Sequence, residues 1–238
     1  MFDKLTQSHS VEIIVTSLVG GMLPAFIWLR FWLSEDEHGE PKGLIALTFV
    51  GGMIAVVLAI PMQQIVANIF SDQINTITLW AGIEEILKFL IVVVIAYPSM
   101  HIDEPIDWPI YCVIAGLGFA ALENIFFLFK PESVGDSTVM LMTTNLRFLG
   151  STLLHSTASS FVGLLIGLSY YQSKFIKFLS FIVGIILAIT LHSLFNFFII
   201  QNDGENFLQV FAFLWVVTII SILVFEKVRR MHIYSGIE

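Results

Sequence analysis

Seven long apolar stretches dominate this sequence and limit the folds that it can adopt. Each approaches the ~20 residues that an α-helix needs to cross the hydrocarbon core of a bilayer. The composition agrees, because 57% of the residues are hydrophobic, 13% are charged and the mean hydropathy is +0.88. The sequence therefore predicts an all-α, polytopic transmembrane helix bundle of seven helices, or eight at most. The stretches cover residues 11–33, 43–60, 77–97, 109–129, 146–171, 175–200 and 207–225.

The chain is expected to be a single integral-membrane domain spanning residues 1–238. No proline- or serine-rich linker, low-complexity tract or block of charge divides it. A net charge of −8 without clustered Lys and Arg excludes a nucleic-acid-binding surface. The single cysteine, Cys112, excludes an intramolecular disulfide and a cysteine-based metal cluster. The first apolar stretch lacks a basic flank and a cleavage site, so it is interpreted as a retained helix rather than a signal peptide.

The few basic residues predict the orientation of the chain in the membrane. Most of them flank alternate connections and the C-terminal end, and the positive-inside rule then places the N-terminus outside and the C-terminus in the cytoplasm. The longest connection, residues 60–76, mixes polar and apolar residues, so it is either an amphipathic surface helix or a polar loop. Glycines at positions 51–52, 116, 118, 163 and 167 indicate close helix packing.

Ionisable side chains interrupt four of the apolar stretches. A charged group at such depth is costly, which indicates a functional role. With a rise of ~1.5 Å per residue, five of them lie about two turns from the outer surface, so we expect one layer in the outer half of the membrane. These five are Glu84, Glu85, Glu123, His155 and His192. Spacings of three and four residues place several on shared helix faces. The candidate catalytic residues are Glu84, Glu85, Lys88, Glu123, His155, His192 and Asn196.

The residue types in this layer fit hydrolysis of an amide. Neighbouring carboxylates in a low-dielectric site do not all ionise, which supplies a base and an acid. Imidazole and amide groups can stabilise an oxyanion. Alternatively, Glu123, His155 and His192 form a zinc shell, with Glu84 or Glu85 as the base. No His-Glu-x-x-His motif is present, so zinc-dependent and metal-free catalysis both stay open. Taken singly, Lys88 could merely neutralise a glutamate and Asn196 could be a helix contact.

Several segments together resemble the PrsW family of intramembrane proteases, which is related to the CAAX-processing, Rce1-type group. They are Glu84-Glu85-x-x-Lys88, residues 116–124, the stretch with Arg147 and His155, and His192-x-x-x-Asn196. The resemblance implies that Glu84 activates water, that Glu85 supports it and that His192 and Asn196 stabilise the oxyanion. The chain departs from the larger group at Lys88 and at Glu123, which replaces a histidine. His155 would then supply the missing imidazole.

The same resemblance implies an intramembrane endopeptidase in a bacterial or archaeal cell membrane. Its partners would be the lipid bilayer and a single-span membrane protein substrate, such as an anti-sigma factor. A proton- or ion-coupled transporter is the main alternative, because buried Glu, His and Lys also form proton relays. A non-catalytic scaffold with the same fold is the third.

Overall fold

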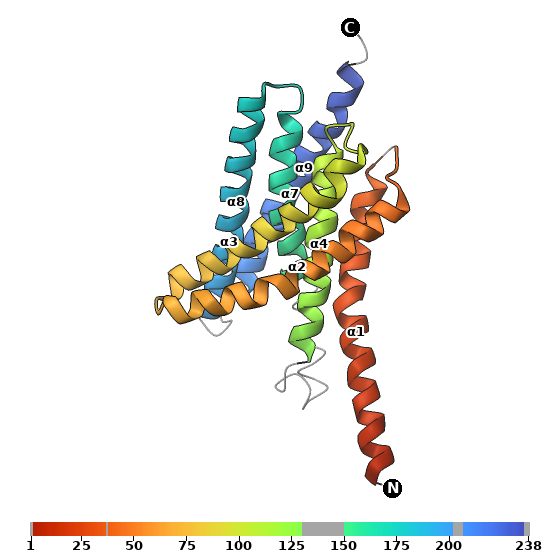
Figure 1. The fold of residues 1–238 in the computed structure, drawn as a ribbon, viewed down its shortest axis with the longest axis vertical. Helices are drawn as coiled ribbons and strands as arrows, with labels where there is room; N and C mark the ends of the chain where they lie inside the picture. Colours follow the sequence, from red (N-terminus) through yellow and green to blue (C-terminus); the bar gives the residue numbers. More distant parts are fainter. Residues whose placement is uncertain (1, 37, 130–149, 202–206, 236–238) are drawn as a thin grey trace.

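The computed structural model describes residues 2–36, 38–129, 150–201 and 207–235, and these residues form seven α-helices and no strand (Figure 1). The expected all-α fold is confirmed. Beyond Ile91, the third helix continues through a π-helical turn, Val92–Ala96, and a 3₁₀ turn, Tyr97–Ser99. The helices are α1 (Phe2–Ser34), α2 (Lys42–Ile69), α3 (Gln73–Ile91), α4 (Asp107–Leu128), α7 (Thr152–Leu168), α8 (Lys174–Gln201) and α9 (Phe207–Ser235).

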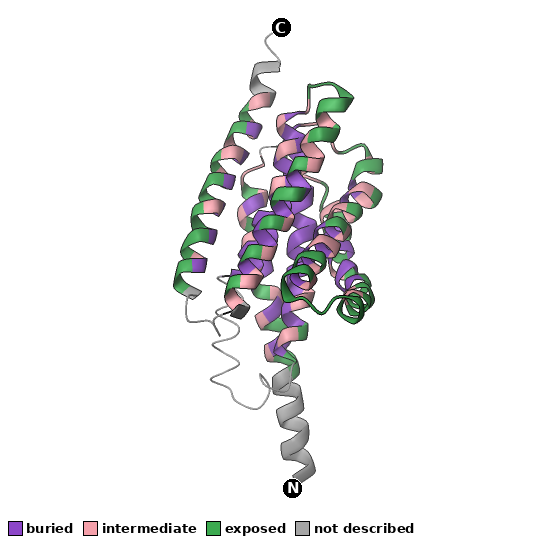
Figure 2. Ribbon diagram, turned by 90° about the vertical axis from the view of Figure 1, so that its left-hand side faces the viewer, coloured by how far each residue is buried: buried purple, intermediate pink, exposed green. Residues whose placement is uncertain are grey.

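Five of these helices are long and apolar enough to cross a membrane. The five segments are Ile14–Ser34, Lys42–Ile69, Asp107–Leu128, Lys174–Ile199 and Leu208–Met231. The other two of the described helices are shorter: α3 has 19 residues, three of them charged, and α7 has 17. Large apolar side chains cover the outside of the bundle, and buried residues face its centre (Figure 2). Such an exterior suits contact with lipid.

Helix α4 forms the centre of the bundle. It is buried over 78% of its most apolar window, against 22–39% for the other four candidate spans. It packs against α1, α2 and α7, while α8 packs against α7 and α3. A side chain at Gly118 would collide with the backbone of Phe49 in α2, and one at Gly116 would collide with Ser159 in α7. The predicted role of these glycines in close helix packing is confirmed.

The connection between α2 and α3 differs from both structures expected for residues 60–76. Helix α2 continues through Pro61 to Ile69, and α3 begins at Gln73, which leaves only residues 70–72 between them. Proline is tolerated within membrane helices, so Pro61 does not end α2. Asp72 caps α3 by accepting a hydrogen bond from the backbone N–H of Asn75 (2.9 Å). The resulting hairpin crosses the bundle obliquely, and its tip extends beyond the neighbouring helices (Figure 1).

A polar contact at the start of α4 anchors the connection that precedes α2. The Tyr111 hydroxyl donates a hydrogen bond to Glu40 (2.5 Å), and Asp107 accepts hydrogen bonds from the backbone N–H groups of Asp103 and Glu104 (2.9 and 2.6 Å). Burial raises the pKa of the Glu40 carboxyl above its usual range. These contacts hold α2 in register with α4, which matters because α2 also reaches the site described next.

Candidate active site

Ionisable side chains from four helices meet inside the bundle. Helix α3 contributes Glu84, Glu85 and Lys88, while α4 contributes Glu123. His155 of α7 and His192 of α8 complete the group. All are buried except Glu123, whose side chain is 21% exposed. The structure therefore brings together six of the seven residues that the sequence singled out.

Glu85 lies at the middle of this group with both carboxylate oxygens in use. Its Oε1 accepts a hydrogen bond from Lys88 Nζ (2.6 Å) and one from His192 Nδ1 (2.7 Å). Its Oε2 lies 3.5 Å from the Ser159 hydroxyl of α7. A buried carboxylate needs a counter-charge and donors to stay ionised, and these three partners supply both. Lys88 thus has at least the neutralising role that the sequence suggested.

His155 continues the network away from Glu85. Its Nδ1 lies 3.1 Å from Lys88 Nζ, and its Nε2 lies 3.2 Å from Glu123 Oε2. A protonated lysine only donates hydrogen bonds, so Nδ1 accepts and Nε2–H donates to Glu123. We call the continuous series Glu123, His155, Lys88, Glu85 and His192 the buried polar chain. The Phe119 ring covers it, with Lys88 Nζ 5.1 Å from the ring centroid.

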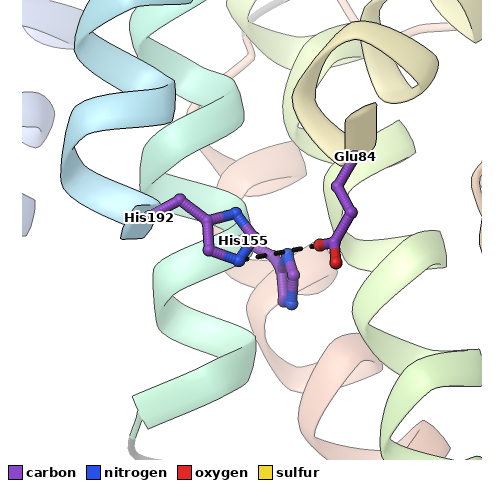
Figure 3. Close-up of side chains that lie close together, drawn as sticks. All are labelled: Glu84, His155 and His192. Carbon is purple, nitrogen blue, oxygen red and sulfur yellow. Dashed lines mark ion pairs between the residues drawn. The ribbon is translucent and has the colours of Figure 1, made fainter. Parts of the chain in front are cut away.

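Glu84 and His192 face each other at the end of the buried polar chain. Because His192 donates from Nδ1 to Glu85, its Nε2 points toward Glu84, and Nε2 lies 3.6 Å from Glu84 Oε2 (Figure 3). Among the described residues, Oε2 has no hydrogen-bond partner. Two basic atoms this close require a proton or a cation between them: a proton on the imidazole, a proton on the carboxyl group, or a metal ion.

The donor set fits a divalent metal ion. Ligand atoms of Glu84, His155 and His192 all lie within 4.8 Å of one another, and one carboxylate with two imidazoles is a usual zinc set. The Glu85 carboxylate on the second nitrogen of His192 is the support that metal-bound histidines commonly have. His155 uses both ring nitrogens in the buried polar chain, so as a ligand it would release Lys88 or Glu123. The set predicted from the sequence had Glu123 where this group has Glu84.

The seventh candidate, Asn196, takes part in none of the contacts described above. Asn196 lies one turn beyond His192 on α8 and is half-buried. Arg147 lies outside the described residues. Sequence reasoning missed Ser159 and also Gln63, which reaches Glu84 from α2. Ser159 is four residues after His155, so the shared helix face was a usable signal; no comparable signal pointed to Gln63.

An apolar cavity opens at the seam between α3 and α8. It has a volume of about 240 Å³, and its lining includes Ser193, the residue that follows His192. The other lining residues are Ile74, Ile77, Thr78, Leu194 and Phe197, so on α3 the cavity begins about two turns from Glu84. The seam thus offers room for apolar groups.

Comparison with known proteins identifies relatives of this chain. A model of the PrsW family, described as intramembrane metalloproteases, matches residues 40–224. Proteins named Protease PrsW from Bacillus subtilis (strain 168) and Geobacillus kaustophilus (strain HTA426) are each 30% identical over 112 residues. Those matches cover 45% of this chain and 51% and 50% of the relatives, so they span about half the relatives' length.

A third protein named Protease PrsW, from Shouchella clausii (strain KSM-K16), is 24% identical over 227 residues, which is 92% of this chain and 100% of that protein. No solved structure matches. The family model covers most of the chain, including the whole buried polar chain and Glu84. This chain therefore belongs to the PrsW family of intramembrane metalloproteases.

Proposed function

We propose that this chain is an intramembrane endopeptidase that hydrolyses a peptide bond of a membrane-anchored protein, with Glu84 as the group that activates water. One observation carries the proposal: Glu84 Oε2 is buried without a hydrogen-bond partner among the described residues and faces His192 Nε2 at 3.6 Å. Glu85 is the less suitable base, because Lys88, His192 and Ser159 already occupy its oxygens.

In the proposed reaction, a water molecule enters between Glu84 and His192. Glu84 takes a proton from the water as the water oxygen bonds to the carbonyl carbon of the scissile peptide. Protonated His192 and the Asn196 amide stabilise the negative charge that develops on the carbonyl oxygen. The carbon–nitrogen bond then breaks, and the proton moves from Glu84 to the leaving nitrogen. Glu85 and Lys88 hold His192 in the orientation that this requires.

A divalent ion such as Zn²⁺ would be held by Glu84, His155 and His192. When bound, it would supply Lewis-acid polarisation of the carbonyl or of water. Zinc analysis of the purified protein, paired with chelator treatment, decides between the two forms. Stoichiometric zinc with chelator-sensitive cleavage supports the zinc form. Full activity with less than stoichiometric zinc supports the metal-free form.

The proposed substrate is a single-span membrane protein, such as an anti-sigma factor, in a bacterial or archaeal cell membrane. The basic residues near α1, near the α7–α8 connection and at the end of α9 favour an external N-terminus and a cytoplasmic C-terminus. In this orientation the site lies in the outer half of the bilayer, which suits cleavage near the outer boundary of a single span. The comparisons do not favour the transporter alternative.

Substitution of the two facing residues tests the proposal. Glu84→Gln and His192→Ala should each lower the cleavage rate by at least about 100-fold, because each removes a group that handles the reacting proton or charge. The assay uses proteoliposomes and a set of single-span bacterial membrane proteins. Glu226→Gln is the control variant, because Glu226 pairs with Arg229 and Arg230 near the end of α9. It should cleave at the wild-type rate. Wild-type cleavage by folded Glu84→Gln would refute the role of Glu84.

A further inference from the structure

We infer that Gln63 of α2 is a positioning residue for Glu84 and fixes the direction in which the Glu84 carboxylate points. The inference deepens the proposed function, since it assumes that Glu84 is the reacting group. Gln63 belongs to the part of α2 beyond Pro61, which runs toward the turn that joins α2 to α3. This segment has no part in the reaction as described so far.

The contact between Gln63 and Glu84 is short and specific. The side-chain amide of Gln63 donates a hydrogen bond from Nε2 to Glu84 Oε1 over 2.7 Å. Glu84 is 6% exposed and Gln63 is half-buried, so the bond is partly shielded from solvent. Hydrogen bonds to a carboxylate are stronger than neutral ones, and a low-dielectric setting strengthens them further. The bond is therefore strong enough to select one rotamer of Glu84.

Gln63 is itself held in place by α3. The indole N–H of Trp80 donates to the backbone carbonyl of Gln63 over 3.0 Å. Trp80 and Glu84 are four residues apart, so they share one face of α3. Helix α3 thus binds Gln63 twice: Trp80 donates to its backbone carbonyl, and Glu84, one turn later, accepts from its side-chain amide. Because the Trp80 hydrogen bond already fixes the backbone of Gln63, the Gln63 side chain loses less conformational entropy when it binds Glu84.

As a consequence, the two carboxylate oxygens of Glu84 have different partners. Gln63 occupies Oε1, and Oε2 is left facing His192 Nε2 at 3.6 Å. Without the amide, the carboxylate could rotate and present either oxygen, or neither, to His192. Misplacement of a reacting group by about 1 Å can cost on the order of 100-fold in rate. The structure therefore assigns to Gln63 of α2 the role of orienting the Glu84 carboxylate.

A kinetic comparison of two neighbouring glutamines tests this role. Gln63→Met removes the amide and keeps the length and flexibility of the side chain. Gln64→Met makes the same change at an exposed position of α2. The probe is a single-span protein that wild type cleaves and Glu84→Gln does not. Gln63→Met should lower kcat by about 10- to 100-fold, the worth of a hydrogen bond to a charged group. KM should change by less than about twofold, because Gln63 acts on the base and not on the substrate.

Two kinetic results would overturn the inference. One is a Gln63→Met variant whose kcat stays within about twofold of wild type. The other is an equal loss of kcat in Gln63→Met and Gln64→Met, which would show a general effect on α2. If the first result came with a raised KM, it would place Gln63 in substrate binding.

A double-mutant cycle on thermal unfolding tests the contact without any substrate. Gln63→Met should lower Tm when Glu84 is present and leave Tm unchanged in a Glu84→Ala background, because the amide then has no carboxylate to bind. Equal Tm shifts in both backgrounds would refute the contact. The cycle does not depend on cleavage, so coupling in Tm with no proteolysis by wild type would indicate failure of the proposed function alone.

Discussion

At the scale of single residues, the orientation of the His192 ring follows from its neighbours. Glu85 accepts from Nδ1, and Lys88 holds Glu85 in its charged form. The imidazole therefore cannot turn its Nδ1 toward Glu84 without leaving Glu85 with one partner fewer. In the proposed reaction, Glu85 and Lys88 would act through His192, which is a positioning role. The two adjacent glutamates differ in their contacts: Glu84 Oε2 faces His192 without a hydrogen-bond partner among the described residues, and Glu85 uses both oxygens in contacts with protein side chains.

The Lys88 and Glu85 pair yields a stability prediction. Lys88→Met should destabilise the protein by ~3–5 kcal/mol, because Glu85 would be left as a buried carboxylate without its cation. The double variant Lys88→Met with Glu85→Leu should be clearly more stable than Lys88→Met, because the uncompensated charge is gone. Unfolding in detergent, followed by circular dichroism against denaturant or temperature, measures both. A Lys88→Met variant as stable as wild type would show that the Lys88–Glu85 ion pair does not contribute to the free energy of unfolding.

At the scale of helices, α7 is fixed on three sides. His155 and Ser159 face α3, while Thr157 and Ser160 meet Thr218 and Ser221 of α9 at 2.9 and 2.6 Å. A side chain at Gly163 would collide with Pro109 in α4. Small and hydroxyl-bearing residues let membrane helices approach closely and bond across the interface. Three such contacts set the rotation of α7 and therefore the direction of His155.

Gly118→Ala should disrupt the crossing of α2 and α4. The added methyl group would meet backbone atoms of Phe49, which cannot rotate away as a side chain would, so a loss of ~1–3 kcal/mol or more is expected. Gly82→Ala is the matched control, because the methyl group there would meet only Ile189 Cδ1 at 3.7 Å. It should be neutral or slightly stabilising, as alanine favours helix more than glycine does. Equal Tm values for the two variants would contradict this account.

The sequence predicted the helical fold and the convergence of the ionisable residues, and missed how the helices are rotated. Apolar run length and ~1.5 Å per residue were enough to place Glu84, Glu123 and the histidines in one layer. Depth does not say which carboxylate faces which imidazole, so the predicted metal set contained Glu123. Gln63 was missed because residues 60–76 were expected to form a surface connection. The contact with Glu84 exists only because α2 continues and folds back onto α3.

At the scale of the whole molecule, the two ends of the bundle differ. Helix α1 begins at one end and α9 finishes at the other (Figure 1). The turn between α2 and α3 lies toward the end where α1 begins, and the α7–α8 connection lies toward the end where α9 finishes (Figure 1). An odd number of membrane crossings gives this arrangement. The proposed orientation therefore places these two connections on opposite sides of the membrane.

Labelling of single introduced cysteines tests this orientation in intact cells. Ser71→Cys, in the α2–α3 turn, should react with a membrane-impermeant maleimide added outside, because its position is exposed and predicted to be external. Ser173→Cys, equally exposed before α8, should react only after the cells are made permeable. The native Cys112 is buried, so unmodified protein is the blank. Labelling of Ser173→Cys alone in intact cells would reverse the proposed orientation.

The proposed reacting pair lies across the seam between α3 and α8 and not within one helix. Glu84 belongs to α3 and His192 to α8, their facing atoms are 3.6 Å apart, and an apolar cavity opens elsewhere along the same seam. A movement of about 1 Å along the line that joins these two atoms would change their separation by more than a quarter. The lateral pressure and thickness of the surrounding lipid act directly on such movements. Turnover should therefore vary with bilayer composition even when every side chain is unchanged.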